Sequence, residues 1–190
     1  MKPDYKTLPF KTATAWRLWL NKNHATVDGV WLKIYKKGSN IPTVTYAEAL
    51  DEALCYGWID GQKKSYDEDS FLQKFTPRRP KSMWSKRNIE HVARLTEQKL
   101  MMPSGLAQVE QAQKDGRWAA AYDTASNMVV PAEFMSELKQ HPVAEKFFAT
   151  LNKTNTYAIA WRLQTAKAEE TRKRRQDKII ALLNAEQKLH

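Results

Sequence analysis

The strand-like patterns of this sequence are confined to residues 30–76, and only helix-like patterns follow them. Residues 30–36 alternate between aliphatic side chains and side chains that are aromatic or basic, which predicts a strand with one buried face. Residues 58–66 and 70–76 indicate two further strands around an acidic turn. We therefore expect an α+β fold: a small mixed or antiparallel sheet with packed helices, followed by a C-terminal helical region.

Helical periodicity and capping residues locate the other elements. Thr45 and Glu48 have the spacing of a capping box, and Ser82 or Ser85 is suited to begin the helix that follows the strands. The predicted helices cover residues 12–23, 45–57, 82 or 85 to 100, 103–114, 131–141, 143–151, 155–165 and 169–184. We expect residues 1–122 to form an α+β domain, residues 123–130 a linker, and residues 131–190 a helical region.

Several classes of site find no support in the composition. The 190 residues include one cysteine, Cys55, which excludes an internal disulfide and a multi-cysteine zinc site and which we expect to be a buried apolar side chain. The four histidines lack metal-binding spacing, so we expect no metal and no cofactor. No apolar run reaches the ~18 residues of a membrane span, and no secretory signal is evident, so we expect a cytoplasmic protein.

The positive charge of the chain is concentrated in two segments. Formal net charge is +10, from 31 Lys and Arg against 21 Asp and Glu. Residues 74–94 hold seven positive and one negative side chains, a net +6, and residues 162–178 hold seven and three, a net +4. Such patches favour anionic partners, whereas the alternative for each segment is an ordinary solvated face.

Six stretches of the sequence resemble the bacteriocin-protection family, also called the YdeI or OmpD-associated family. They cover residues 31–38, 46–50, 56–61, 75–86, 115–118 and 166–172, so that the resemblance spans about residues 28–183. It implies a bacterial protein tied to survival of bacteriocins or other antimicrobial peptides. It implies no defined reaction and no catalytic residue, so we favour a binding protein over an enzyme.

The strongest candidate site is the loop of residues 75–88. Pro77 and Pro80 stiffen a segment that displays two arginines, and the helix that follows adds free amides and a partial positive charge. With the flat ring of a tryptophan, this combination suits a small anion or a phosphate-bearing molecule. The predicted binding residues are Arg78, Arg79, Trp84, Ser85, Lys86 and Asn88. The alternative is that the arginines pair with nearby acids and only stabilise the loop.

A second candidate lies in the stretch of residues 57–64. Asp60 stands between two glycines, where backbone can approach a ligand closely, and it could orient an arginine or a substrate. We expect Asp60, Gln62 and Lys63 to lie near the arginine loop. The alternative is that Asp60 is a turn residue or an ion-pair partner.

The favoured function is therefore protection through binding of an anionic ligand at the basic, aromatic loop. One alternative is nucleic-acid binding by both basic segments, through Lys81, Arg87, Arg172 and Arg175. The other is an enzyme acting on a small phosphorylated or carboxylated substrate, which requires a pocket around Asp60. The sequence indicates no particular protein partner.

Overall fold

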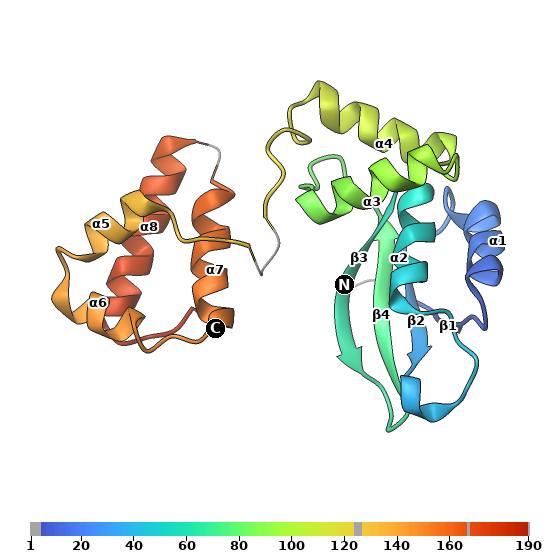
Figure 1. Ribbon diagram of the computed structural model, residues 1–190, viewed down its shortest axis with the longest axis horizontal. Helices are drawn as coiled ribbons and strands as arrows, with labels where there is room; N and C mark the ends of the chain where they lie inside the picture. The colour runs from blue at the N-terminus through green and yellow to red at the C-terminus, as the bar shows by residue number, and fades with distance from the viewer. Residues whose placement is uncertain (1–4, 124–126, 167, 190) are drawn as a thin grey trace. The chain divides into compact units, whose positions relative to one another are not determined.

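The computed structural model describes residues 5–123, 127–166 and 168–189. Its contacts divide the chain into two compact units, with the boundary between Ala121 and Tyr122 (Figure 1). Each unit has a hydrophobic core of its own. The expected linker at residues 123–130 includes positions 124–126, which lie outside the described residues.

One mixed sheet forms the centre of the first unit. Its strands are β1 (Thr7–Pro9), β2 (Val30–Tyr35), β3 (Trp58–Ser65) and β4 (Ser70–Pro77). The order across the sheet is β1-β2-β4-β3, with β1 parallel to β2 and the other pairs antiparallel. The predicted α+β fold is confirmed. The sequence does not predict β1, because three residues that include a proline show no alternation.

Side-chain caps begin three of the four helices of this unit. The helices are α1 (Ala13–Asn23), α2 (Tyr46–Cys55), α3 (Lys86–Glu97) and α4 (Pro103–Lys114), and a short 3-10 turn, η1 (Lys37–Ser39), follows β2. Thr12 caps α1, and the capping box of Thr45 and Glu48 is present at α2. Of the two serines proposed for α3, Ser85 is the cap, since its hydroxyl accepts a hydrogen bond from the Asn88 amide.

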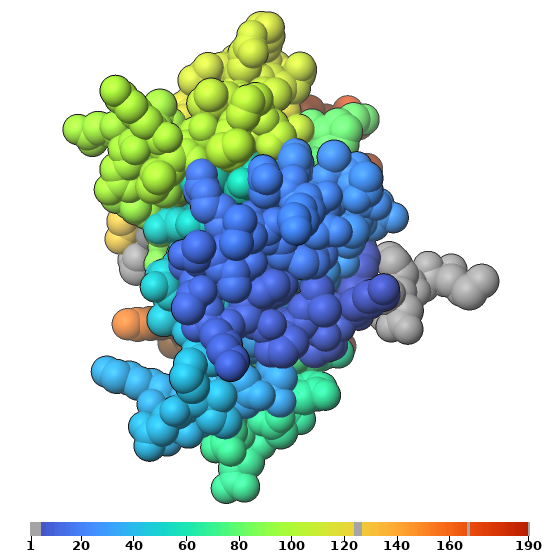
Figure 2. Space-filling view, turned by 90° about the vertical axis from the view of Figure 1, so that its right-hand side faces the viewer, coloured from blue at the N-terminus to red at the C-terminus, as the bar shows by residue number. Residues whose placement is uncertain are grey.

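The core of this unit lies between one face of the sheet and the helices. The aliphatic side chains of β2 are buried on this face, as its alternation predicts. Trp16 of α1 packs against Trp58 of β3 and Phe75 of β4. Helix α2 packs on both α1 and β3. In Figure 2, residues of the α1 region (blue) fill the centre of the face that the helices cover.

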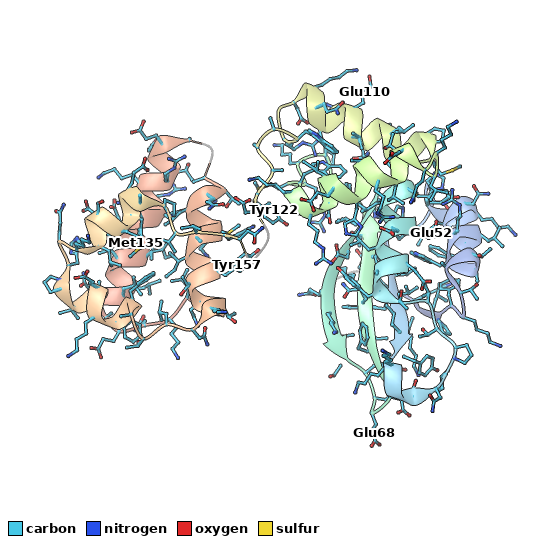
Figure 3. The ribbon with its side chains drawn as sticks, viewed as in Figure 1. Glu52, Glu68, Glu110, Tyr122, Met135 and Tyr157 are labelled. Atoms are coloured by element: carbon cyan, nitrogen blue, oxygen red, sulfur yellow. The ribbon has the colours of Figure 1, made fainter. Side chains whose placement is uncertain are left out.

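A β-bulge interrupts the pairing of β3 with β4. The register shifts between Asp60 and Lys63, which pair with Phe75 and Gln73 respectively. Gln73 is only 3% exposed, and its side-chain amide donates to the Gly61 carbonyl at 2.9 Å. A bulge removes backbone groups from the ladder, and the buried amide satisfies one of them. The hairpin turn that follows carries Glu68 at its tip (Figure 3).

The second unit is helical. Its helices are α5 (Ala132–Leu138), α6 (Pro142–Phe148), α7 (Lys153–Gln164) and α8 (Glu169–Asn184). Phe134, Leu138, Ile159 and Leu183 are buried together in its core. The predicted C-terminal helical region is thus confirmed. None of the described helices in either unit combines the length and apolarity needed to cross a membrane.

Candidate functional site

Two of the predicted binding residues form the interior of the loop between β4 and α3. Arg78 is 5% exposed and Trp84 is 2% exposed. The guanidinium carbon of Arg78 lies 3.5 Å from the centroid of the Trp84 ring, and its Nη1 donates to the Met83 carbonyl at 3.3 Å. The indole face that the sequence suggests for ligand stacking is therefore occupied by Arg78, and this pair stabilises the loop.

A second buried arginine, in the segment that follows α4, contacts the same loop. Arg117 is 6% exposed, and its Nη1 donates to the Ser82 carbonyl at 2.9 Å. Its Nε donates to Asp115 at 2.8 Å, which holds the pKa of that carboxyl below its usual value. Trp118 packs against Trp84 with ring centroids 4.9 Å apart. Sequence reasoning assigned no binding role to this stretch, because nothing in its spacing indicates which distant residues it contacts.

Four cations remain exposed around the start of α3. They are Arg79, Lys81, Lys86 and Arg87. Within the described residues, Arg79, Lys81 and Arg87 form no ion pair. These cations surround a helix N-terminus, where unpaired amides and the helix dipole add further positive potential. The backbone amide of Asn88 is already used by the Ser85 cap.

Asp60 of β3 forms a hydrogen bond with a tyrosine of α2, near the start of the candidate site. Its Oδ2 accepts a hydrogen bond from the Tyr46 hydroxyl of α2 at 2.8 Å. Burial and the Asp60 charge raise the pKa of Tyr46, and the positive charge of Arg87 acts in the opposite direction. Tyr46 therefore lies within electrostatic reach of both Asp60 and Arg87. Sequence reasoning missed Tyr46 as a site residue, although it opens one of the stretches that carry the family resemblance.

Gln62 and Lys63 occupy a different part of the hairpin. Both are exposed, and Gln62 lies within the bulge. The Lys63 ammonium lies 4.2 Å from the centroid of the Phe71 ring, nearer the hairpin turn than Asp60 is. The structure thus places Asp60 beside Tyr46, which is itself within reach of Arg87, and it places Lys63 further along the strand.

The second basic segment belongs to the other unit. Arg172 lies 3.7 Å from Glu133 in an exposed ion pair. Arg175 is half-buried and donates to the Arg162 carbonyl at 2.7 Å, so that it connects α8 with the end of α7. Of the four residues proposed for nucleic-acid binding, Arg175 therefore has a structural contact, and Lys81 and Arg87 are exposed on the first unit.

Metal-ligating and nucleophilic side chains do not gather in the described part of the chain. No three His, Cys, Asp or Glu side chains there are close enough to hold a metal ion. Cys55 is 1% exposed, and burial raises the pKa of its thiol to about 11. A buried thiol in its protonated form is a poor nucleophile and a poor metal ligand.

Each of the two units matches the model of a protein family. Residues 8–108, more than half of the chain, match the family described as Domain of unknown function (DUF8412). Residues 127–186 match OmdA, described as Bacteriocin-protection, YdeI or OmpD-Associated. The chain belongs to the DUF8412 family, and its helical second unit is similar to the OmdA family. Searches of curated proteins and of solved structures found no match.

The OmdA match confirms the resemblance to the bacteriocin-protection family and limits its extent. It covers the helical second unit, including the stretch of residues 166–172. The stretches at residues 31–38, 46–50, 56–61 and 75–86 lie instead within the DUF8412 match, and residues 115–118 lie outside both. The loop of residues 75–88 and the pair of Asp60 and Tyr46 therefore lie within the part of the chain that matches DUF8412.

Proposed function

We propose that this protein contributes to bacteriocin protection by binding a phosphate-bearing small molecule at the start of α3, in its DUF8412 domain. The observation that carries the proposal is the group of exposed cations at that helix N-terminus: Arg79, Lys81, Lys86 and Arg87. Because Arg79, Lys81 and Arg87 have no ion-pair partner among the described residues, their charge is available to an external anion.

The buried part of the loop supports this role. The stack of Arg78 on Trp84 and the hydrogen bond from Arg117 to Ser82 give the loop a fixed interior. A loop that is already ordered loses little conformational entropy when a ligand binds. Arg78 and Trp84 then act as supports, and the exposed cations supply the contacts to phosphate.

Asp60 and Tyr46 add a preference for one kind of phosphate ligand. A carboxylate beside a phosphate site repels a second anionic group and accepts hydrogen bonds from hydroxyls. Asp60 is half-buried and fixed by Tyr46, so its remaining lone pairs have a defined direction. The ligand we propose therefore carries a hydroxyl as well as a phosphate, as a sugar phosphate or a nucleoside monophosphate does.

The OmdA match supports the link to protection. A basic protein repels cationic peptides, so the protection we propose is indirect and acts through the phosphate ligand in the cytoplasm.

The binding step is tested by thermal unfolding of the full chain with inorganic phosphate, ribose 5-phosphate and AMP in 150 mM NaCl. A probe at about 100 times its dissociation constant stabilises the protein by roughly 2.7 kcal/mol, which raises the melting temperature by several degrees. We expect the shift to be lost in the double variant Arg79→Gln, Arg87→Gln. We expect it to be kept in a control with the same change in charge, Lys22→Gln, Lys114→Gln, on α1 and α4.

The proposal is wrong if the arginine variant, shown by circular dichroism to be folded, keeps the full shift, or if no phosphate probe stabilises the native protein. The link to protection is tested separately. Cells that express the arginine variant at wild-type level should survive a bacteriocin no better than cells without the protein, whereas the lysine control should protect.

A further inference from the structure

The sheet of the first unit has one face that no described helix of that unit covers. In the register of the ladders, Trp31 pairs with Lys74, and Lys33 pairs with Leu72, which in turn pairs with Lys64. Directly paired residues share a face, and this face is opposite to the one on which the aliphatic residues of β2 meet the helices. Figure 1 shows α1 and α2 on the same side of the sheet. We name the uncovered side the open face.

The open face combines aromatic rings with lysines. The Lys64 ammonium extends across β4 and lies 4.2 Å from the centroid of the Trp31 ring. The Lys33 ammonium lies 4.7 Å from the Tyr35 ring and 4.9 Å from the Tyr66 ring. Leu72, which pairs with both Lys33 and Lys64 on this face, is only 2% exposed. The open face therefore presents two half-buried rings, Trp31 and Tyr35, each with a lysine ammonium close to it.

The positive charge of the open face comes from three lysines, Lys33, Lys64 and Lys74. Lys64 and Lys74 form no ion pair with any described residue. Lys33 is paired with Asp67 of the turn at 3.0 Å. Lys33 is thus partly neutralised. The Lys64 ammonium contacts the Trp31 ring and the Lys74 ammonium lies 4.8 Å from the Tyr5 ring, and a ring contact leaves the charge of each lysine available to an anion.

We propose that the open face binds single-stranded nucleic acid, with bases stacked on Trp31 and Tyr35 and phosphates on Lys64 and Lys74. Along β2 the backbone positions of these two residues are roughly 13 Å apart, at about 3.3 Å per residue, which leaves room for two or three splayed nucleotides. Four-stranded sheets that bind RNA stack bases on strand aromatics in this way. A duplex hides its base faces, so the open face favours single strands.

The lysines that now cover the rings do not block stacking. An exposed contact between a cation and a ring contributes about 2- to 5-fold to an equilibrium constant, whereas a base stacked on an aromatic side chain contributes roughly 5- to 150-fold. A base therefore displaces the ammonium of Lys64 from Trp31, and the long side chain can turn toward a phosphate. An acidic peptide would use the lysines but would gain nothing from the rings, so the rings favour nucleic acid.

This inference concerns a different surface from the phosphate site at α3 and is tested independently. The test is fluorescence anisotropy of the full chain with a labelled ten-nucleotide oligo-dT, the matching duplex, and heparin. We expect oligo-dT to bind at least tenfold more tightly than the duplex. With two lysines on phosphates the salt slope is about −1.4, so affinity falls roughly sevenfold between 50 and 200 mM NaCl.

Substitutions distinguish the contribution of the aromatic rings to binding from that of the lysine charges. Trp31→Leu and Tyr35→Leu should each weaken oligo-dT binding about 5- to 150-fold without changing the salt slope. The double variant Lys64→Gln, Lys74→Gln should reduce the slope by about 1.4. Two controls, Lys22→Gln with Lys114→Gln and the exposed Trp161→Leu of the second unit, should change neither quantity.

The proposal is overturned if folded ring variants bind oligo-dT as well as the wild type does, or if heparin competes equally well against wild type and ring variants. If Trp31→Leu does not fold, Tyr66→Leu replaces it, because Tyr66 is 55% exposed and lies under Lys33. The Arg79→Gln, Arg87→Gln variant should keep its oligo-dT affinity within twofold. Loss of binding there, with the ring variants unaffected, would place the nucleic acid at α3 and contradict the open-face proposal alone.

Discussion

Arg78 and Arg79 are neighbours in the chain and have opposite surroundings. Arg78 is buried on the Trp84 ring and bonded to the Met83 carbonyl, whereas Arg79 is exposed. A buried guanidinium is tolerated only where carbonyls and ring faces satisfy it. We therefore assign loop stability to Arg78 and ligand contact to Arg79.

Replacing Arg78 and replacing Arg79 should change the free energy of unfolding by different amounts. Replacing Arg78 by Gln removes charge-assisted hydrogen bonds inside the loop and should lower the free energy of unfolding by about 2–3 kcal/mol. Replacing the exposed Arg79 by Gln should change it by no more than about 0.5 kcal/mol. Urea unfolding followed by circular dichroism measures both. Equal effects from the two substitutions would show that the loop interior is not built as described.

Cys55 should be unreactive while the protein is folded. Its thiol is buried and its pKa is about 11, above the ordinary value of 9.0, so at pH 8 the thiolate is scarce and shielded. A thiol reagent should therefore modify Cys55 at least a hundred times faster in denaturant than in native buffer. Rapid labelling of the native protein would contradict this.

The raised pKa of Cys55 also makes the stability of the protein depend on pH. Because the folded thiol resists ionisation, its contribution to stability is complete below about pH 9 and is lost as pH rises toward 11. Raised tyrosine pKa values act in the same direction. The difference in unfolding free energy between wild type and Cys55→Ala isolates the thiol, and we expect that difference to shrink between pH 9 and pH 11. A constant difference would contradict the assignment.

The candidate site was only partly predictable from the sequence. Clustered charge is a local property, and the basic loop was recognisable from it. Burial depends on distant residues: nothing local indicates that Arg117 and Trp118 support the loop or that Tyr46 reaches Asp60. Sequence reasoning therefore located the loop and could not distinguish its interior from its surface.

At the scale of elements, local signals predicted the helices well. Ser85 caps α3 and Thr45 caps α2, and each cap is encoded within four residues. The elements that were missed depend on partners. Strand β1 exists through its parallel pairing with β2, and the bulge at Asp60 requires the buried amide of Gln73. Neither has a local pattern that identifies it.

Contact between α2 and α4 depends on a glycine. A Cβ built on Gly105 meets the carbonyl oxygen of Cys55 well inside van der Waals contact, and backbone cannot move aside as a side chain can. Gly105→Ala should therefore cost about 1–3 kcal/mol of unfolding free energy or more. Gly38 has open space around it, so Gly38→Ala is the matched control and should be close to neutral. Chemical denaturation of both variants tests this, and a neutral Gly105→Ala would contradict the close packing.

At the scale of the whole molecule, the boundary between the two units falls in the interval between the two family matches. The DUF8412 match falls in the first unit and the OmdA match in the second. The two basic segments are distributed one to each unit. The sequence predicted the sheet and the helical region correctly, and it attributed to one family a resemblance that two families share.

The second unit should fold without the first. Its core of Phe134, Leu138, Ile159 and Leu183 shares no residue with the core of the first unit. A fragment of residues 127–190 should therefore show a helical circular dichroism spectrum and a single cooperative melting transition. A fragment that is unfolded at low temperature would show that this unit depends on the first.

The cations at the start of α3 should bind phosphate, and amide chemical shifts of the labelled full chain report this binding residue by residue. During titration with ribose 5-phosphate, we predict saturable shifts that are largest at Arg79 and at residues 86–88, with β2 unaffected. Shifts that are absent at these amides, or that are largest elsewhere in the chain, would contradict the account.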